Sequence, residues 1–230
     1  MNAVLAQRPR RRRFFQESFT FPSAQNPIAS GWQNNSDYYT KARVGGAGNC
    51  YGLQPNPFVT DQYQDAYAYR LGYDPFEQYV EIVAKVGTTA GQQEIECLLN
   101  WVDTNNTTSG YECGISNNGQ YAFINRAKGV TLSGPADISN YDECVQVLGV
   151  VSVTNGMLIK AWRKNYTIHF CYGGTSLTLD GTDIVSPFDC TSGGRIPMSG
   201  GGPGIGFFSG TGAAANDQFG ISACKTMNVQ

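Results

Sequence analysis

The chain has 230 residues, of which 28 are glycine, 41% are hydrophobic and 15% are charged. This length suits one sizeable domain, and a composition rich in glycine and poor in charge is typical of a protein with many turns. The formal net charge is −2, and the sequence has no apolar run of about 18 residues, which excludes a membrane-spanning helix.

The first predicted segment is a basic N-terminal arm, residues 1–16. Five of the 16 basic residues lie within residues 8–13, so the other 11 stand against 18 acidic residues. Such an arm suits nucleic acid, an acidic protein groove or a neighbouring copy, although a solvated tail has the same composition. The seven residues before the arginines are too few for the apolar region of a secretory signal. We predict an arm that anchors the protein in an assembly through Arg8, Arg10, Arg11, Arg12, Arg13, Phe14 and Phe15.

The next stretch of the chain is rich in turn residues and predicts few strands. Phe19, Phe21 and Trp32 indicate an edge strand followed by a turn, and the segment from Tyr63 to Tyr69 indicates another strand. The one candidate for a helix is a short turn near Asp61.

From Tyr79 onward, apolar and polar residues alternate in short segments, which predicts β-strands. We expect them at residues 79–86, 94–102, 110–116, 120–126, 144–153, 157–163, 166–170, 177–181, 202–208 and 217–221. The connection Asn117-Asn118-Gly119 is typical of a β-hairpin. Residues 17–230 are therefore predicted to form one all-β domain, an antiparallel sandwich of the jelly-roll type.

The order of these strands resembles the concanavalin A-like lectin/glucanase domain, in particular its laminin-G-type jelly roll, which also occurs in bacteriophage virion proteins. The matching stretches are Phe15-Gln-Glu-Ser-Phe-Thr, Tyr79-Val-Glu-Ile, Leu98-Leu99 before Gly110-Tyr111, Leu179-Asp-Gly181, Gly202-Pro-Gly-Ile-Gly-Phe207 and Asp217-Gln-Phe219. The resemblance implies two stacked antiparallel sheets, with a concave face that often binds sugars or protein partners. Glu17 stands where many members carry Asp and Gln218 where many carry Asn, so no metal site is carried over.

Seven cysteines are many for a reduced cytosolic protein of this size. Cys97 alternates with apolar neighbours and is predicted to lie in the core. No CxxC pair occurs and the single histidine is His169, so we expect neither a zinc site nor any other metal or cofactor. An odd count permits an intermolecular disulfide, although all thiols could equally be free. The candidates, which lie in or beside glycine-rich loops or the C-terminal tail, are Cys50, Cys190 and Cys224.

Glu94 and Glu96 come nearest to a catalytic pair. Glycosidases that share the resembled fold carry the pattern Glu-x-Asp-x-x-Glu, whose carboxylates work as a pair across the scissile bond. Here Glu94-Ile-Glu96 is followed by Cys97-Leu-Leu, so the third carboxylate is missing. We interpret the pair as a solvated acidic edge and predict that the protein is not an enzyme.

Two functions from different classes fit these features. The first is a structural or accessory virion protein of a tailed bacteriophage, anchored by its arm, in contact with other virion proteins and with copies of itself. The alternative is an adhesin that binds host-surface carbohydrate on the concave face, and nucleic-acid packaging is a weaker third option because the body is acidic. Candidate glycan-stacking rings, which more often serve as core residues, are Tyr63, Tyr67, Tyr69, Trp101, Trp162 and Tyr166.

Overall fold

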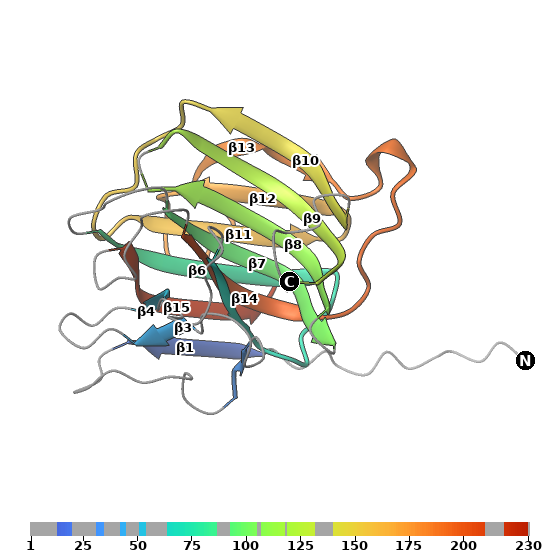
Figure 1. Cartoon of the computed structure of the whole chain (residues 1–230), viewed down its shortest axis with the longest axis horizontal. Coiled ribbons are helices and arrows are strands. Elements are labelled where there is room, and N and C mark those ends of the chain that lie inside the picture. Colours follow the sequence, from blue (N-terminus) through green and yellow to red (C-terminus); the bar gives the residue numbers. More distant parts are fainter. Residues whose placement is uncertain are drawn as a thin grey trace, which may run out of the picture.

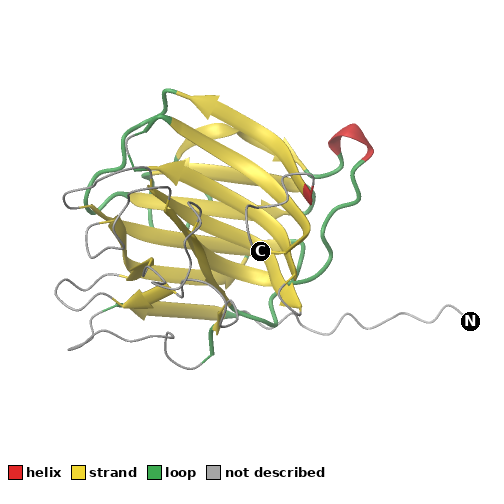
Figure 2. Cartoon of the chain, viewed as in Figure 1, coloured by secondary structure: helices red, strands yellow, loops and turns green. Residues whose placement is uncertain are grey.

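The computed structural model describes residues 13–19, 31–34, 42–44, 51–53, 64–86, 93–104, 107–117, 119–131, 140–209 and 219–229. These residues form two antiparallel β-sheets packed face to face (Figure 1 and Figure 2). Within these ranges there is no α-helix, and Ser192–Gly194 forms a 3-10 turn. No helix in this part of the chain is long and apolar enough to cross a membrane.

The first sheet, sheet A, has eight strands: β1 (Phe14–Ser18), β3 (Ala42–Val44), β4 (Tyr51–Leu53), β6 (Glu77–Val86), β11 (Leu158–Lys164), β12 (Thr167–Tyr172), β13 (Thr182–Asp189) and β15 (Phe219–Asn228). Their spatial order is β13-β12-β11-β6-β15-β4-β3, and β1 also pairs with β15.

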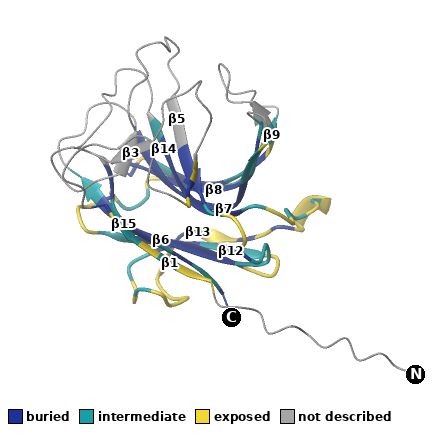
Figure 3. Ribbon diagram, turned by 90° about the horizontal axis from the view of Figure 1, so that it is seen from below, coloured by how far each residue is buried: buried dark blue, intermediate teal, exposed yellow. Residues whose placement is uncertain are grey.

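The second sheet, sheet B, has seven strands: β2 (Gln33–Asn34), β5 (Gln64–Tyr69), β7 (Gln93–Thr104), β8 (Thr107–Ser116), β9 (Tyr121–Thr131), β10 (Tyr141–Leu148) and β14 (Gly202–Ser209). Their order is β10-β9-β8-β7-β14-β5-β2, which puts β7 in the middle. Figure 3 shows that sheet B curves away from sheet A, so that its outer face is hollowed. This outer face of sheet B is called the concave face below.

The hydrophobic core lies between the two sheets. Along β7, Ile95, Cys97 and Leu99 point into it and are 0–1% exposed, as a period of two requires. They meet inward residues of sheet A such as Val80 and Ile159. Alternate residues of β7 must therefore lie on the concave face.

Most of the predicted strands are confirmed. The segments expected at 79–86, 94–102, 110–116, 120–126, 157–163, 166–170 and 202–208 correspond to β6, β7, β8, β9, β11, β12 and β14, with ends shifted by a few residues. The predicted hairpin joins β8 to β9, where Gly119 has a φ of 69° and its N–H donates to the Ser116 carbonyl at 3.1 Å. The segment near Tyr63 becomes β5, which starts at Gln64.

One predicted strand is wrong and another is too long. Residues 177–181 form a turn, and the chain becomes extended only from Thr182. Leu177 has a φ of 63°, which no β-strand residue adopts. The strand expected at 144–153 ends at Leu148, because Gly149 has a φ of 69° and breaks the extended backbone.

The basic arm is shorter than predicted, because Phe14 and Phe15 already belong to β1. Phe14 pairs with Met227 and Phe15 with Thr226 across the β1–β15 ladder. The edge strand expected around Phe19 is therefore displaced towards the N-terminus, and it ends at Ser18. Arg8, Arg10, Arg11 and Arg12 lie outside the described residues, as does Asp61. The closing strand predicted at 217–221 is described from Phe219 and extends to Asn228.

The cysteines of the described ranges are all free thiols. Cys190 and Cys224, two candidates for an intermolecular bridge, are 0% and 1% exposed and belong to the core between the sheets. Burial there raises the pKa of both thiols. Neither is positioned to reach another chain while the domain stays folded, and Cys50 lies outside the described residues.

Candidate functional site

The concave face carries an aromatic cluster built from β5 and β7. Tyr67 and Tyr69 flank the inward-facing Ala68 of β5, and Leu98 and Trp101 come from β7. The rings of Tyr67 and Trp101 meet edge to face, with centroids 5.5 Å apart and planes at 66°. These four side chains and Ala127 of β9 pack as one cluster that is separate from the core.

A local irregularity in β7 places the indole of Trp101 on this face. Asn100 has a φ of 55°, and the β7–β8 register shifts between Leu99 and Val102. The Asn100 side chain donates to the carbonyl oxygens of Pro75 and Gly200, at 2.8 and 2.9 Å. These hydrogen bonds hold a backbone conformation that is uncommon for a non-glycine residue.

Asp103 organises the polar edge of the cluster. Tyr67 donates its hydroxyl proton to Asp103 Oδ2 at 2.8 Å, and the Asp103 backbone N–H donates to the Tyr69 hydroxyl at 3.1 Å. Burial, and to a lesser extent the nearby Asp103 charge, raise the pKa of Tyr69, although a hydrogen bond with the Asp103 backbone opposes them. The raised pKa favours the neutral form of Tyr69.

Three buried polar atoms of this region have no hydrogen-bond partner among the described residues. They are Trp101 Nε1, Asp103 Oδ1 and, on β9, Asn125 Oδ1. A buried donor or acceptor without a partner costs about 1–3 kcal/mol, so native proteins contain few of them. One donor and two acceptors on one sheet face are suited to a ligand that can both accept and donate hydrogen bonds.

Carboxylates occupy the centre of the concave face. Glu94 and Glu96 alternate with the core residues of β7, and each is 7% exposed. Tyr121 donates its hydroxyl proton to Glu94 Oε1, and Tyr141 donates to Glu112 Oε1 at 3.3 Å. The interpretation of Glu94 and Glu96 as a solvated acidic edge is therefore wrong, because β7 is a central strand and both side chains are buried.

Glycines on neighbouring strands make room for these side chains. A Cβ added to Gly206 of β14 would clash with the Glu96 carboxylate, and one added to Gly114 of β8 would clash with the Phe123 ring. Both glycines have extended neighbours on either side, so close side-chain approach, and not a turn, accounts for their lack of a Cβ.

The third position of the glycosidase pattern is Leu99, an apolar residue that points into the core. Leu98 follows Glu96 on the same face of β7, and its cross-strand partner on β8 is Glu112. Sequence reasoning missed Glu112, Asp103 and Asn125. Asp103 follows Trp101 by two residues and could have been found by alternation, whereas Glu112 and Asn125 reach this face through strand register.

The other candidate rings do not join this cluster. Trp162 lies on the outer face of sheet A, where its indole stacks on His169 with centroids 4.9 Å apart. Tyr166 precedes β12 and is 52% exposed, and Tyr63 lies outside the described residues. Of the predicted stacking residues, the structure brings together Tyr67, Tyr69 and Trp101, which are 1–4% exposed and thus covered in this conformation.

The described ranges contain no group of three or more His, Cys, Asp or Glu side chains that could hold a metal ion.

No protein-family model and no curated protein matches this chain. Among solved structures, the exoplasmic/lumenal domain of VIP36 in its Ca2+-bound form is similar over 94% of this chain and 90% of that one, with 11% identity and a TM-score of 0.57. Its Ca2+/Man2-bound form is similar over 94% and 88%, with 9% identity and a TM-score of 0.56. A glycoside hydrolase family protein from Mycobacterium thermorestibile is similar over 93% and 97%, with 12% identity and a TM-score of 0.51. The chain has a concanavalin A-like lectin/glucanase fold, and the resemblance noted in the sequence is confirmed.

Proposed function

We propose that this protein, a concanavalin A-like lectin/glucanase domain by its fold, binds carbohydrate on the concave face of sheet B. The observation that carries the proposal is the set of polar atoms without partners, Trp101 Nε1, Asp103 Oδ1 and Asn125 Oδ1, on a face that also carries aromatic rings. Sugar hydroxyls both donate and accept hydrogen bonds, so one ligand can serve the indole donor and both acceptors. Aromatic rings supply an apolar surface for the C–H faces of the sugar.

Sugar binding at this site requires a conformational change that exposes the aromatic cluster. Tyr67, Tyr69 and Trp101 are almost fully buried, so a sugar cannot reach them in the conformation described here. The energetic cost of opening is offset when the ligand satisfies polar atoms that otherwise lack partners. We therefore expect slow association and a change in the environment of Trp101 on binding.

The comparisons support the same class of ligand. VIP36, which shares the fold, has a solved structure in a Ca2+/Man2-bound form. At 9% identity this likeness carries the fold and not the residues. The proposal of sugar binding therefore rests on the atoms of this chain's own concave face.

We infer binding and not hydrolysis. Glycosidases of this fold type need an acid and a nucleophile or base flanking the scissile bond. On β7, Leu99 takes the place where a further carboxylate would complete the pattern begun by Glu94 and Glu96, and it points into the core. A substrate that stays intact after prolonged incubation with the purified protein is the expected result.

The virion role predicted from the sequence rests on the arginine run and on composition, and it stays a prediction. The same holds for contacts with other virion proteins, for self-association and for location in a virion. A glycan-binding domain is compatible with each of them.

A glycan array probed with the full chain and two matched variants tests the proposal. Trp101→Phe keeps an aromatic ring but removes the Nε1 donor, whereas Trp162→Phe makes the same change on the outer face of sheet A. We expect wild type and Trp162→Phe to bind the same glycans, and Trp101→Phe to bind about tenfold more weakly, the loss expected for one hydrogen bond of about 1.4 kcal/mol. Absence of glycan binding by the folded wild-type chain, or equal binding by all three proteins, would contradict it.

A further inference from the structure

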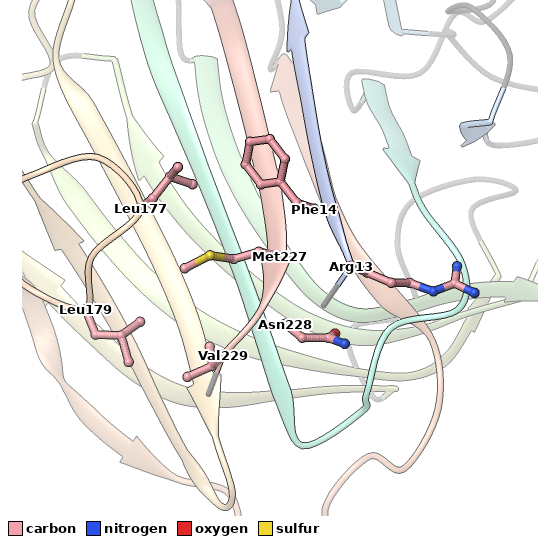
Figure 4. Close-up of a pocket in the computed structure, with 7 residues that line it drawn as sticks. All are labelled: Arg13, Phe14, Leu177, Leu179, Met227, Asn228 and Val229. Carbon is pink, nitrogen blue, oxygen red and sulfur yellow. The ribbon is translucent and has the colours of Figure 1, made fainter. Parts of the chain in front are cut away.

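The outer face of sheet A carries an apolar pocket that the concave-face proposal does not use. Its volume is about 440 Å³, within the range of roughly 300–1,000 Å³ common for small-molecule sites. Figure 4 shows Leu177, Leu179, Met227 and Val229 around it, with Phe14 on its upper side. Val229 is buried, whereas Phe14, Leu177 and Leu179 are 54%, 36% and 37% exposed. Three large apolar side chains are thus held at the surface around one hollow.

Buried hydrogen bonds hold Leu177 in this exposed position. Its backbone N–H donates to Glu81 Oε2 at 2.8 Å, and the Ser176 hydroxyl donates to Glu81 Oε1 at 2.6 Å. Glu81 is itself 1% exposed, and Lys225 Nζ lies 2.9 Å from its Oε1. The φ of 63° at Leu177 costs about 1 kcal/mol or more for a residue with a Cβ. The sheet therefore stabilises a strained conformation that points a leucine outward.

A second buried charge fixes the other leucine. Lys160 is 0% exposed, and its Nζ donates to Asp180 Oδ1 at 2.7 Å and to the Thr175 carbonyl oxygen at 3.2 Å. Asp180 also accepts from the Thr175 backbone N–H at 3.0 Å. Leu179 is held between these anchored residues. A turn this firmly anchored, with its leucines left exposed, is suited to a preformed binding site.

The polar end of the pocket is positively charged. Arg13 and Asn228 lie on the side away from the leucines, and the Arg13 side chain extends past the pocket, where Nη1 donates to the Leu71 carbonyl oxygen at 3.2 Å (Figure 4). Arg13 has no carboxylate partner in the described ranges. Of the carboxylates near the turn, Glu81 pairs with Lys225 and Asp180 with Lys160. Among the charged groups named here, the Arg13 guanidinium is thus the one without an oppositely charged partner in the described ranges.

From this geometry we propose that the outer-face pocket binds an amphipathic anion, a straight-chain fatty carboxylate. The aliphatic tail lies among Leu177, Leu179, Met227 and Val229, and the carboxylate lies at the pocket's polar end and pairs with the Arg13 guanidinium after a rotation of that exposed side chain. The proposal is independent of carbohydrate binding, since the two sites are on opposite faces of the sandwich.

The first test is a titration of the full chain, labelled with 13C at its methionine methyl groups, with hexanoate, octanoate and decanoate. We expect saturable binding that strengthens roughly fourfold per added methylene, as burial of each group predicts. The Met227 methyl resonance should shift, while that of Met198, which packs against the core between the sheets, should not. Decyltrimethylammonium, with the same tail and the opposite charge, should bind much more weakly than decanoate. Absence of saturable binding, or equal binding of the cation, would overturn the proposal.

Three variants complete the test. Leu179→Asn should weaken decanoate binding about tenfold, and Arg13→Gln should weaken it by up to about fivefold, as expected for an exposed ion pair, while leaving decanol binding unchanged. Ile196→Asn alters an apolar side chain that is 79% exposed and does not line the pocket, so its affinity should match that of wild type. Thermal unfolding of each variant shows that it is folded. Unchanged decanoate affinity in either of the first two variants would contradict the proposal.

Discussion

Tyr67 and Trp101 meet edge to face on the concave face of sheet B, with their ring centroids 5.5 Å apart. Tyr67 donates its hydroxyl proton to Asp103 Oδ2, whereas the Trp101 indole N–H has no partner among the described residues. The polar group of Tyr67 thus has a hydrogen-bond partner, and that of Trp101 is available for a ligand. An aromatic pair with an available donor is suited to a sugar, which offers both C–H faces and hydroxyl oxygens.

The first prediction concerns the glycine that faces Glu96. Gly206→Ala should destabilise the protein by about 1–3 kcal/mol, because its Cβ would clash with the Glu96 carboxylate in the middle of the sheet. Gly200→Ala is the matched control, since a Cβ there meets no atom within 4 Å. Its effect should stay within about 0.5 kcal/mol. Urea unfolding of both variants measures the difference, and equal stabilities would show that Gly206 is not needed for close approach.

The second prediction concerns the buried Glu81 carboxylate. Glu81→Gln removes the charge that pairs with Lys225 while keeping the size of the side chain, and it should cost about 2–3 kcal/mol of unfolding free energy. Glu143→Gln, at an exposed position of β10, should cost almost nothing. Chemical denaturation of the two variants compares them directly. A Glu81→Gln protein as stable as wild type would mean that the network contributes no net stability.

The third prediction is a loss of stability in acid. Burial alone would raise the pKa of Glu81, but hydrogen bonds from Ser176, Tyr79, the Leu177 N–H and Lys225 outweigh it, so its pKa lies below the ordinary 4.5. The hydrogen bond from Lys160 lowers the pKa of Asp180 from 3.8 to about 2. Both carboxylates bind protons more tightly in the unfolded chain than in the folded one. Their stabilising effect is therefore complete above about pH 5 and is lost as the pH falls towards about 2.

Unfolding free energies measured from neutral to acidic pH check this. The wild-type curve should fall most steeply below about pH 4.5, and Glu81→Gln should give a shallower acid limb because one of the shifted groups is gone. Parallel curves for the two proteins would rule out Glu81 as a source of the pH dependence.

The fourth prediction concerns the thiols. Burial raises the pKa of Cys97, Cys113, Cys190 and Cys224, and it raises that of Cys144 to about 11, so none is a reactive thiolate near neutral pH. An aromatic disulfide reagent should therefore modify these residues only after denaturant is added. If the native protein forms a disulfide-linked dimer on a non-reducing gel, Cys50→Ser should abolish it, whereas Cys190→Ser and Cys224→Ser should leave it intact. A dimer that depends on Cys190 or Cys224 would show that the core opens in solution.

Alternation within strands was the part of the fold that could be predicted from the sequence. It placed Ile95, Cys97 and Leu99 on one face of β7 and Glu94 and Glu96 on the other, as the structure has them. The same alternation put Trp101 with Cys97, which is wrong, because the irregularity at Asn100 turns Trp101 to the concave face. It failed at Leu177 and Leu179, where two leucines two residues apart suggested a strand. Long-range hydrogen bonds, from the Leu177 N–H to Glu81 and from Lys160 to Asp180, instead fold that segment into a turn, and no local pattern reveals them.

The candidate site was predictable only in part, for a related reason. Tyr67, Tyr69 and Trp101 were identified as aromatic candidates together with Trp162, but the chemistry of the rings does not show that Trp162 lies on a different sheet. That depends on strand order, since β5, β14 and β7 are neighbours in sheet B while β11 lies in sheet A. Glu112 is brought beside Leu98 by the register of the β7–β8 pair, which shifts at a bulge. Burial of Glu94 and Glu96 likewise depends on what packs over the concave face, which the strand pattern does not encode.

The most direct measurement of the central claim is the indole N–H spectrum of the 15N-labelled protein during titration with an oligosaccharide that binds it. The chain has 3 tryptophans, so the spectrum separates Trp101 from Trp32 and Trp162. We predict that the Trp101 Nε1–H signal moves downfield as it gains a hydrogen bond, while the other two stay in place. Saturable glycan binding that leaves the Trp101 signal unmoved would contradict the concave-face site.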